Sequence, residues 1–210
     1  MAANEISLPD AKLHIQLLAR SHHKLKQPAE LEIRAIFEGQ PIQSKRFNPT
    51  NPASIEQALK FSEFQNDLKK NIYIIPSPIV AEGNPNSACN DTDVMAATHF
   101  YVDADDEGAA ENLIKEWKQP ADFIVVTGAV PHLRLHSYWE LDQPTTDIEK
   151  WCQLQQFLID AHSCDQVIKN PSRVMRLGGF LTHPSNKKQE RGYVAELVKL
   201  YYQGEYHDFL

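Results

Sequence analysis

The sequence has few cysteines and no long apolar segment. Its 210 residues include three cysteines, Cys89, Cys152 and Cys164, which are too few and too irregularly spaced for a zinc knuckle or a disulfide framework. No apolar run approaches the ~18 residues that a membrane-spanning helix needs, so we expect no membrane partner. The first residues, MAANEISLPDAK, have neither a basic start nor an apolar signal core. We therefore expect a protein of the reducing cytoplasm.

Positive charge is also scarce, except in one segment. The formal net charge is −7, which argues against a protein that coats nucleic acid through a general basic surface. Residues 166–191, however, contain six Lys or Arg and one Glu, so this segment carries +5 and the rest of the chain −12. The segment predicts either a solvated basic surface or a local anion site.

The order of expected elements mixes helices and strands. Asp10, Ser54 and Thr146 are the expected N-caps of three of the helices. Strand hairpins favour an antiparallel sheet over a doubly wound one, so we expect one α+β domain over residues 1–210. Helices are expected at about 10–21, 54–70, 106–118 and 146–161, strands at about 31–39, 40–47, 71–80, 98–102, 122–128, 133–141 and 192–202, and loops at 82–93 and 170–180.

Two carboxylates stand where one expected strand ends, in the stretch HFYVDADDEG. Residues two apart on a strand point to the same face, so Asp103 and Asp105 present their carboxylates together. Two adjacent carboxylates repel each other unless a cation lies between them, and Mg²⁺ or Mn²⁺ prefers oxygen ligands. The pattern indicates either a metal site or a strand that ends in a polar turn.

The strand LRLHSYWEL carries hydrogen-bond donors on one face. His132, Arg134 and His136 alternate with apolar residues, and their side chains suit phosphate oxygens. On its own, a strand histidine is more often a packed or surface residue than a ligand.

A third polar segment, CDQVIKNPSRVMRLGGFLTHPSNKK, follows the last expected helix. Asp165 could bring a third carboxylate to the pair. Arg173 and Arg176 are guanidinium forks suited to triphosphate oxygens, and Lys187 is a compact point charge. The Gly178-Gly179 pair predicts a close approach of the backbone to a ligand.

These three segments together resemble the archaeo-eukaryotic primase superfamily, and in particular the RepB-type primase-polymerase domains of plasmids, phages and integrated elements. The resemblance covers about residues 70 to 188. It rests on three motifs in this order: hhhDhD, then T-G-x-x-x-H-x-x-x-H-x-Y-W-x-L, then D-x-x-x-x-N-P-S-R-V-M-R-L-x-G-F. It implies an RRM-like catalytic sheet over about residues 71–210 and an N-terminal α/β portion over about residues 1–70.

The resemblance also implies roles for individual residues. Asp103, Asp105 and Asp165 would bind two divalent ions, Mg²⁺ or Mn²⁺. The histidine that contacts the phosphates of the incoming nucleotide would be His136, with His132 and Arg134 beside it on the same strand. Arg173, Arg176 and Lys187 would hold the triphosphate or the template.

The implied function is template-directed nucleotidyl transfer, as a DNA primase, a DNA polymerase or both, in the replication of a mobile element. The implied partners are single-stranded DNA and NTP or dNTP substrates. A replicative helicase is a further candidate partner, because relatives often carry a C-terminal helicase.

Two other functions fit part of the pattern. A metal-dependent nuclease also needs clustered carboxylates and a histidine, although the arginines of NPSRVMRLGG argue against it. A non-catalytic replication-initiator module would bind DNA through the basic segment without needing the carboxylates.

Overall fold

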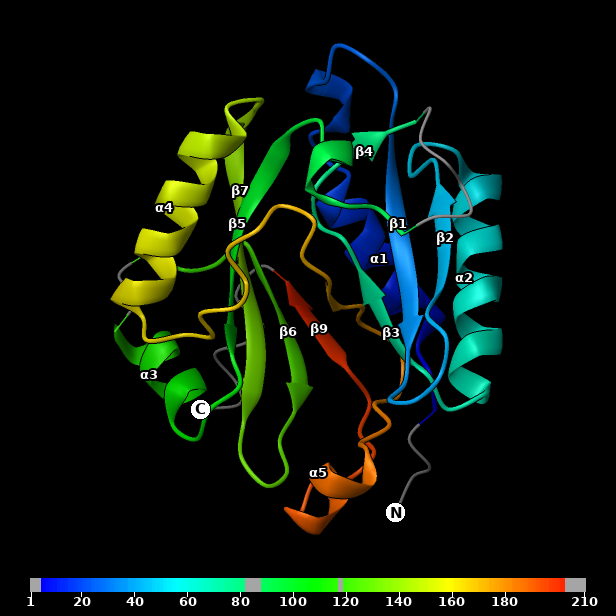
Figure 1. Ribbon diagram of the computed structural model, residues 1–210, viewed down its shortest axis with the longest axis vertical. Coiled ribbons are helices and arrows are strands. Elements are labelled where there is room, and N and C mark those ends of the chain that lie inside the picture. The colour runs from blue at the N-terminus through cyan, green and yellow to red at the C-terminus, as the bar shows by residue number, and fades with distance from the viewer. Residues whose placement is uncertain (1–4, 82–87, 117–118, 203–210) are drawn as a thin grey trace.

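The computed structural model describes residues 5–81, 88–116 and 119–202. These residues form two antiparallel sheets with helices on both sides (Figure 1). The α+β class and the antiparallel pairing expected from the sequence are confirmed. Within these ranges no helix is long and apolar enough to cross a membrane. Residues 82–87 of the expected loop and residues 117–118 at the expected end of the third helix lie outside the described residues.

The first sheet combines N-terminal strands with one short strand from the third motif. Every pairing in this sheet is antiparallel, and α2 packs against its three longest strands. Its strands, in spatial order, are β2 (Gln43–Phe47), β1 (Ala29–Ile36), β3 (Asn71–Ile74) and β8 (Met175–Arg176), with β4 (Ile79–Val80) also paired to β1. The helical segments of this part are α1 (Leu8–Leu18), α2 (Pro52–Asp67) and the short 3₁₀ turns His22–Lys24 and Asp91–Asp93.

The second sheet contains the first and second motifs. Its chain order is strand, helix, strand, strand, helix, followed by a return to the sheet edge, which is the order expected for an RRM-like sheet. Its spatial order is β5 (Ala97–Ala104), β7 (Arg134–Thr145), β6 (Phe123–Gly128) and β9 (Lys199–Tyr202). The remaining helices are α3 (Ala109–Glu116), α4 (Ile148–Ala161) and α5 (Asn186–Glu190).

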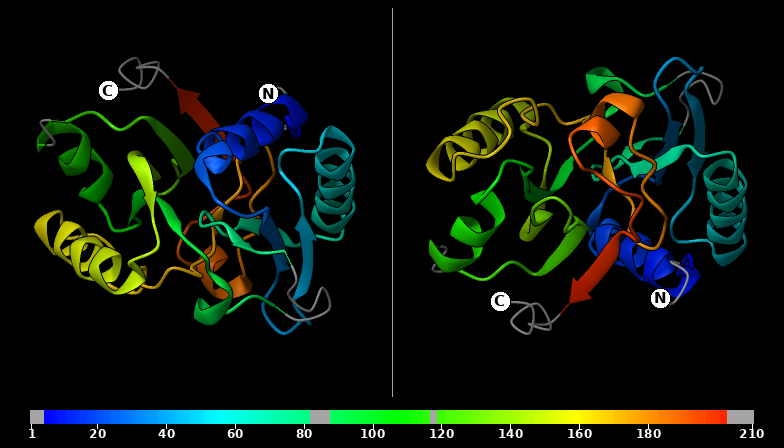
Figure 2. Two further views of the ribbon diagram at one scale, coloured as in Figure 1. Left: turned by 90° about the horizontal axis from the view of Figure 1, so that it is seen from above. Right: turned by 90° about the horizontal axis from the view of Figure 1, so that it is seen from below.

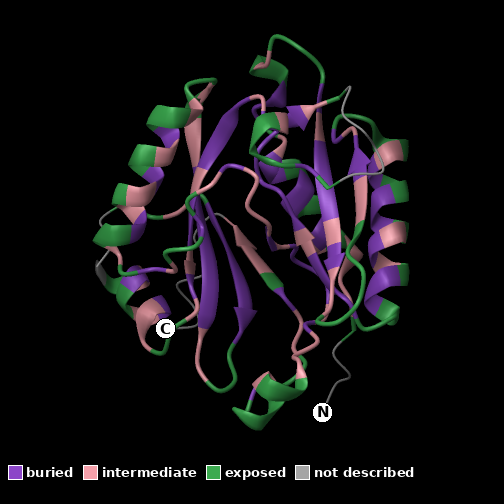
Figure 3. Ribbon diagram, viewed as in Figure 1, coloured by how far each residue is buried: buried purple, intermediate pink, exposed green. Residues whose placement is uncertain are grey.

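One hydrophobic core joins the two sheets. Phe123 of β6 stacks on Tyr138 of β7 with ring centroids 4.5 Å apart. His14 of α1 meets both rings edge-on, and its Nδ1 accepts a hydrogen bond from the Gly178 N–H at 3.0 Å. Buried residues line the strands, whereas α2 and α4 carry exposed residues on their outer sides (Figure 3). Helix α1 therefore links the second sheet to the segment that precedes α5.

The Gly178-Gly179 pair has a structural role that differs from the expected one. Gly179 has a φ of +88°, and a Cβ there would lie 2.2 Å from the Ser7 carbonyl oxygen. The Ser7 N–H donates to the Gly179 carbonyl at 2.7 Å. The close backbone approach that this pair permits is thus made by the start of α1 and not by a ligand.

Several expected boundaries are wrong, for local physical reasons. Asn51 caps α2 in place of Ser54, since its side chain accepts from the N–H groups of Ala53 and Ser54 and Pro52 starts the helix. Ser7 caps α1 in place of Asp10, and Asp147 caps α4 in place of Thr146.

Three expected segments also have different extents. The strand expected over 71–80 is divided into β3 and β4, because Pro76 and Pro78 lack the N–H groups that a ladder needs. The loop expected over 170–180 contains the short strand β8, and the strand expected over 192–202 is regular only in β9.

A buried ionic network stabilises the first sheet. Glu32 of β1 has no exposed surface, and its carboxylate accepts from Arg34 Nε at 2.6 Å, Arg46 Nε at 3.2 Å and the Cys89 N–H at 3.0 Å. Arg46 also reaches Asp93 at 3.3 Å. The network therefore fastens β1 to β2 and to the segment that precedes β5.

We expect Glu32→Ala to lower the free energy of unfolding by about 3–5 kcal/mol, because it leaves the guanidinium group of Arg34 without a carboxylate among the described residues and that of Arg46 with only the more exposed Asp93. Urea unfolding at pH 7 measures this change. Glu38→Ala, on the exposed loop after β1, is the matched control and should change stability by less than about 0.5 kcal/mol. Equal losses in the two variants would contradict a structural role for the network.

Candidate active site

The first and second motifs meet on neighbouring strands of the second sheet. Asp103 of β5 lies directly opposite His136 of β7 in the antiparallel register. The Asp103 Oδ2 atom is 3.6 Å from the His136 Nε2 atom, and His136 is 3% exposed. Asp105 is the residue after β5 ends. The alternation expected from the sequence thus places a carboxylate beside a buried histidine.

The third carboxylate reaches the same place through the loop that follows α4. The Asp165 N–H donates to the Asp103 carbonyl at 3.0 Å, so this loop runs along the free edge of β5. Asp103, Asp105, Asp106 and Asp165 all line one open cavity of about 360 Å³, which we call the carboxylate cavity. In the described ranges, however, no group of three or more His, Cys, Asp or Glu side chains lies close enough together to hold a metal ion as it stands.

Two observations fit a divalent cation in the carboxylate cavity. The Asp103 Oδ1 atom is buried and has no hydrogen-bond partner among the described residues. Burial and the neighbouring Asp103 charge raise the pKa of Asp105, against the opposing effect of Lys188, Arg134 and His136. A cation between these carboxylates would relieve their repulsion and supply a partner to the unpaired oxygen.

A group of cations stands next to the carboxylates. Arg134, Arg176 and Lys188 line a small cavity of about 40 Å³ together with Asp105 and Thr127. We call these three side chains the cationic wall. Such side chains beside a carboxylate cavity can bind the phosphates of a ligand whose metal ions are held by the carboxylates.

The side chains of the cationic wall are held by contacts with several parts of the chain. Arg134 Nη2 donates to Glu196 Oε2 and to the Val130 carbonyl, both at 3.0 Å. The guanidinium carbon of Arg134 lies 4.4 Å from the centroid of the Tyr193 ring, and Lys188 Nζ lies 5.2 Å from it. Arg176 stacks instead over Tyr73 of β3 at 4.7 Å.

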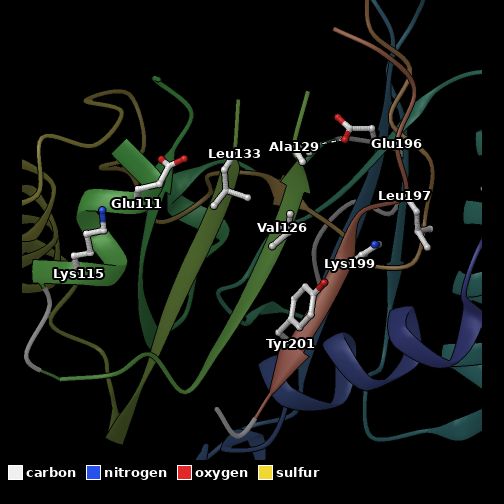
Figure 4. A pocket seen from close by; sticks show the side chains of 10 residues that line it. Glu111, Lys115, Val126, Ala129, Leu133, Glu196, Leu197, Lys199 and Tyr201 are labelled. Atoms are coloured by element: carbon white, nitrogen blue, oxygen red, sulfur yellow. Dashed lines mark hydrogen bonds between the residues drawn. The ribbon is translucent and has the colours of Figure 1, made fainter. Parts of the chain in front are cut away.

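A larger cavity of about 680 Å³ lies between α3 and β9, and Glu196, the partner of Arg134, is one of its lining residues. Glu111 and Lys115 face it from α3, opposite Val126 and Tyr201 of the sheet and Leu133 just before β7 (Figure 4). It shares no lining residue with the carboxylate cavity and combines both signs of charge, so we assign it no part in the chemistry.

Comparison with known proteins identifies the fold. No protein-family model and no curated protein sequence matches the chain. Three solved structures do. The AEP domain of the cyanophage S-2L primase-polymerase has a TM-score of 0.63 at 21% identity, over 95% of this chain and 92% of that one. The chain has the fold of an AEP domain.

Two further structures share this archaeo-eukaryotic primase (AEP) fold. The primase RepB′ matches with a TM-score of 0.56 at 14% identity, over 91% of this chain but only 57% of that longer chain. The catalytic domain of RepB′ in complex with initiator DNA matches at 0.50 and 14% identity, over 90% and 84% of the two chains. The fold that the three sequence motifs implied is therefore confirmed.

The AEP fold gathers some of the predicted site residues more closely than others. His132 lies two residues before β7 and is half-buried, with its Nε2 atom 2.8 Å from the Asp105 carbonyl oxygen. Arg173 is half-buried in the loop before β8 and is not among the residues that line the two cavities. Lys187 is exposed on α5, and its neighbour Lys188 is the lysine that belongs to the cationic wall.

The sequence motifs did not indicate Lys188, Tyr193 or Glu196. Lys188 stands beside the predicted lysine on a helix of five residues, and only the packing of that helix shows which lysine faces the site. Tyr193 and Glu196 were expected within a regular strand. Nothing in the stretch GYVAELVKLYY, which contains three tyrosines, distinguishes Tyr193 or Glu196 as a residue of the site.

Proposed function

We propose that this chain is a template-directed nucleotidyltransferase of the AEP type, acting as a DNA primase, a DNA polymerase or both. The observation that carries the proposal is the carboxylate cavity, with Asp103, Asp105 and Asp165 on its wall, directly beside Arg134, Arg176 and Lys188. Nucleotidyl transfer needs this combination, because divalent metal ions and positively charged side chains must bind the same triphosphate from different sides.

In this proposal each side chain has a distinct task. Asp103, Asp105 and Asp165 would hold two Mg²⁺ or Mn²⁺ ions, which would lower the pKa of an attacking 3′-hydroxyl and stabilise the leaving pyrophosphate. His136 lies within reach of Asp103 and donates to a phosphate oxygen of the incoming nucleotide. The cationic wall orients the triphosphate in line with the attacking group.

The resemblance to plasmid and phage primase-polymerases supports a role in the replication of a mobile element, with a replicative helicase as a candidate partner. A structural relative was solved in complex with initiator DNA, which supports DNA as the nucleic acid that is bound. We propose single-stranded DNA as the template. NTPs or dNTPs are the substrates, and the cytoplasm is the expected location.

Thermal stabilisation by ligands distinguishes this function from its alternatives. We expect a nucleoside triphosphate with Mn²⁺ to raise the melting temperature beyond the effect of Mn²⁺ alone, since both bind the folded chain. A nuclease would respond to the metal alone, and a non-catalytic initiator module to neither. Either of those two results would contradict the proposal.

Tyr193 is expected to act as a positioning residue for the cationic wall. Replacement of its ring in Tyr193→Leu should raise the KM for the incoming nucleotide by roughly threefold to thirtyfold, because Arg134 and Lys188 lose a cation–π contact. The turnover number should change less than the KM.

Tyr193→Phe is the matched control, because it keeps the aromatic face and should retain the KM of the wild type. Steady-state extension of a primed template measures both constants. An equal KM in Tyr193→Leu and Tyr193→Phe would contradict the positioning role.

A further inference from the structure

A second cavity continues from the cationic wall away from the carboxylates. Its volume is about 520 Å³, which is enough for a nucleotide-sized group. Three of its lining residues, Pro184, Tyr193 and Val194, also line the small cavity that contains Asp105. The two cavities therefore adjoin each other at the segment around α5.

The two sides of this second cavity come from distant parts of the chain. One side is formed by Phe37, just after β1, and Lys69, between α2 and β3. The other side is the segment 183–195, which contains α5. Figure 1 and the view from below in Figure 2 place α5 beneath the space between the second sheet and the ends of β1 and β3.

The α5 side is fastened to the first sheet by paired hydrogen bonds. Asn71 at the start of β3 donates to the His183 carbonyl at 2.9 Å and accepts from the His183 N–H at 2.7 Å. Asn66 of α2 makes the same exchange with Leu181, at 2.9 Å and 3.1 Å. The cavity is thus preformed between two walls of fixed relative position.

The lining of this cavity suits a ligand that has both anionic phosphates and planar bases. Phe37 is half-buried, Val194 is 47% exposed, and Pro184 adds a rigid apolar ring to the same lining. Lys69 is exposed, and no Asp or Glu occurs among the described residues that line the cavity. Burial, aided by the Lys69 charge, lowers the pKa of His183, which also lines the cavity.

This chemistry contrasts with that of the carboxylate cavity on the other side of the cationic wall, where four aspartates line the space. Single-stranded nucleic acid is bound by cations that contact its phosphates and by flat side chains that stack on its bases. The apolar rings and the lysine of the second cavity provide both, next to the place where the triphosphate would lie.

We propose that the cavity between Phe37, Lys69 and Pro184 binds one nucleotide of the single-stranded DNA template beside the position of nucleotide addition. The base stacks on Phe37 and Pro184, and a neighbouring phosphate contacts Lys69. The inference rests on the proposed function, since it assigns the template to a place next to the incoming nucleotide. We call this cavity the template cavity.

Fluorescence anisotropy with a labelled single-stranded oligo(dT) tests the template cavity directly. Phe37→Ala should weaken binding about tenfold, because stacking of a base on an aromatic side chain contributes roughly that much. Lys69→Glu should weaken binding to a similar extent and should reduce the slope of log K against log salt by about 0.7, the value for one phosphate contact on a single strand.

The controls are Phe64→Ala and Lys60→Glu, which change an exposed aromatic residue and an exposed lysine on α2. They should bind the oligonucleotide as the wild type does. Stabilisation by metal and nucleoside triphosphate should be the same in all four variants, which shows that each is folded.

The outcomes separate this inference from the proposed function. If Phe37→Ala and Lys69→Glu bind like the controls, or if the wild type does not bind the oligonucleotide, the template cavity is overturned even where the wild type incorporates nucleotides. If both variants bind weakly and the wild type incorporates no nucleotide, the template cavity stands as a binding site and the polymerase function fails.

Discussion

Asp103→Asn is expected to reduce nucleotide incorporation by on the order of 10³-fold. The substitution preserves the volume of the side chain but removes one of the charges that would hold the metal ions, and metal ions supply several kcal/mol of transition-state stabilisation. The carboxylate, whose buried Oδ1 atom has no partner in the described structure, becomes a neutral amide with one NH₂ group that repels cations. Incorporation of labelled nucleotides on a primed template, at saturating Mn²⁺, measures the effect.

Asp106→Asn is the matched control for this prediction. Asp106 lines the same cavity but is exposed and follows the strand that aims Asp103. We expect it to lower incorporation by less than tenfold, and we expect the folded stability of both variants to be close to that of the wild type. Equal activities of Asp103→Asn and wild type would remove the carboxylate cavity from the chemistry.

The second large effect is a loss of stability in mild acid. His14 and His99 are fully buried, and burial is the main reason that the pKa of each is lowered to about 3. His14 also faces His136 and His99, whereas His99 also faces Arg20 and His22, so each neighbouring positive charge lowers the pKa further.

The direction of the pH dependence follows from these values. The unfolded chain, in which both histidines have a pKa near 6.5, takes up protons that the folded chain does not. The stabilisation is therefore complete above about pH 6.5 and is lost as the pH falls toward 3. At pH 5 each of these two histidines should lower the free energy of unfolding by about 2 kcal/mol, which is ~4 kcal/mol for the pair.

Urea unfolding at pH 7, 6 and 5 measures this loss. His22 is a third buried ring, and burial lowers its pKa to about 4, so it adds a similar contribution. His99→Gln should therefore reduce the pH dependence by about a third, whereas His23→Gln, at an exposed position, should leave it unchanged. A free energy of unfolding that is the same at pH 5 and pH 7 would show that the two rings are not held neutral in the core.

The sequence predicted the local parts of the site well. The two-residue period of a strand is a local property, so the sequence could place the side chains of Asp103 and His136 on one face of their own strands. The pairing of β5 with β7 that sets the two residues opposite each other is known from the structure. The antiparallel class followed from the hairpins for the same reason. Helix starts were less accurate, as at α2, where Asn51 outcompetes Ser54 because Pro52 fixes the first turn.

The contacts that complete the site depend on packing between distant segments. Asp165 was identified only by its motif, and its bond to the Asp103 carbonyl shows how the loop after α4 reaches β5. No local pattern could indicate that Glu196 would pair with Arg134 across 62 positions, or that the second of two adjacent lysines would face the site.

The glycine pair also shows what a local sequence pattern cannot predict. Gly178-Gly179 was correctly expected to allow a close backbone approach, yet the neighbour is the start of α1. A glycine pattern indicates that something approaches closely but not what approaches. The template cavity has the same character, since Phe37 and Lys69 meet the α5 segment only in the folded chain.

Template-directed synthesis is the central claim, and incorporation on homopolymer templates tests it most directly. The wild type would be incubated with Mn²⁺, all four labelled nucleotides in separate reactions, and primed oligo(dT) or oligo(dC). We predict incorporation of adenine nucleotides on oligo(dT) and of guanine nucleotides on oligo(dC), dependent on the metal and strongly reduced in Asp103→Asn. Product that ignores the template, a degraded template, or no product on an intact template would contradict the account.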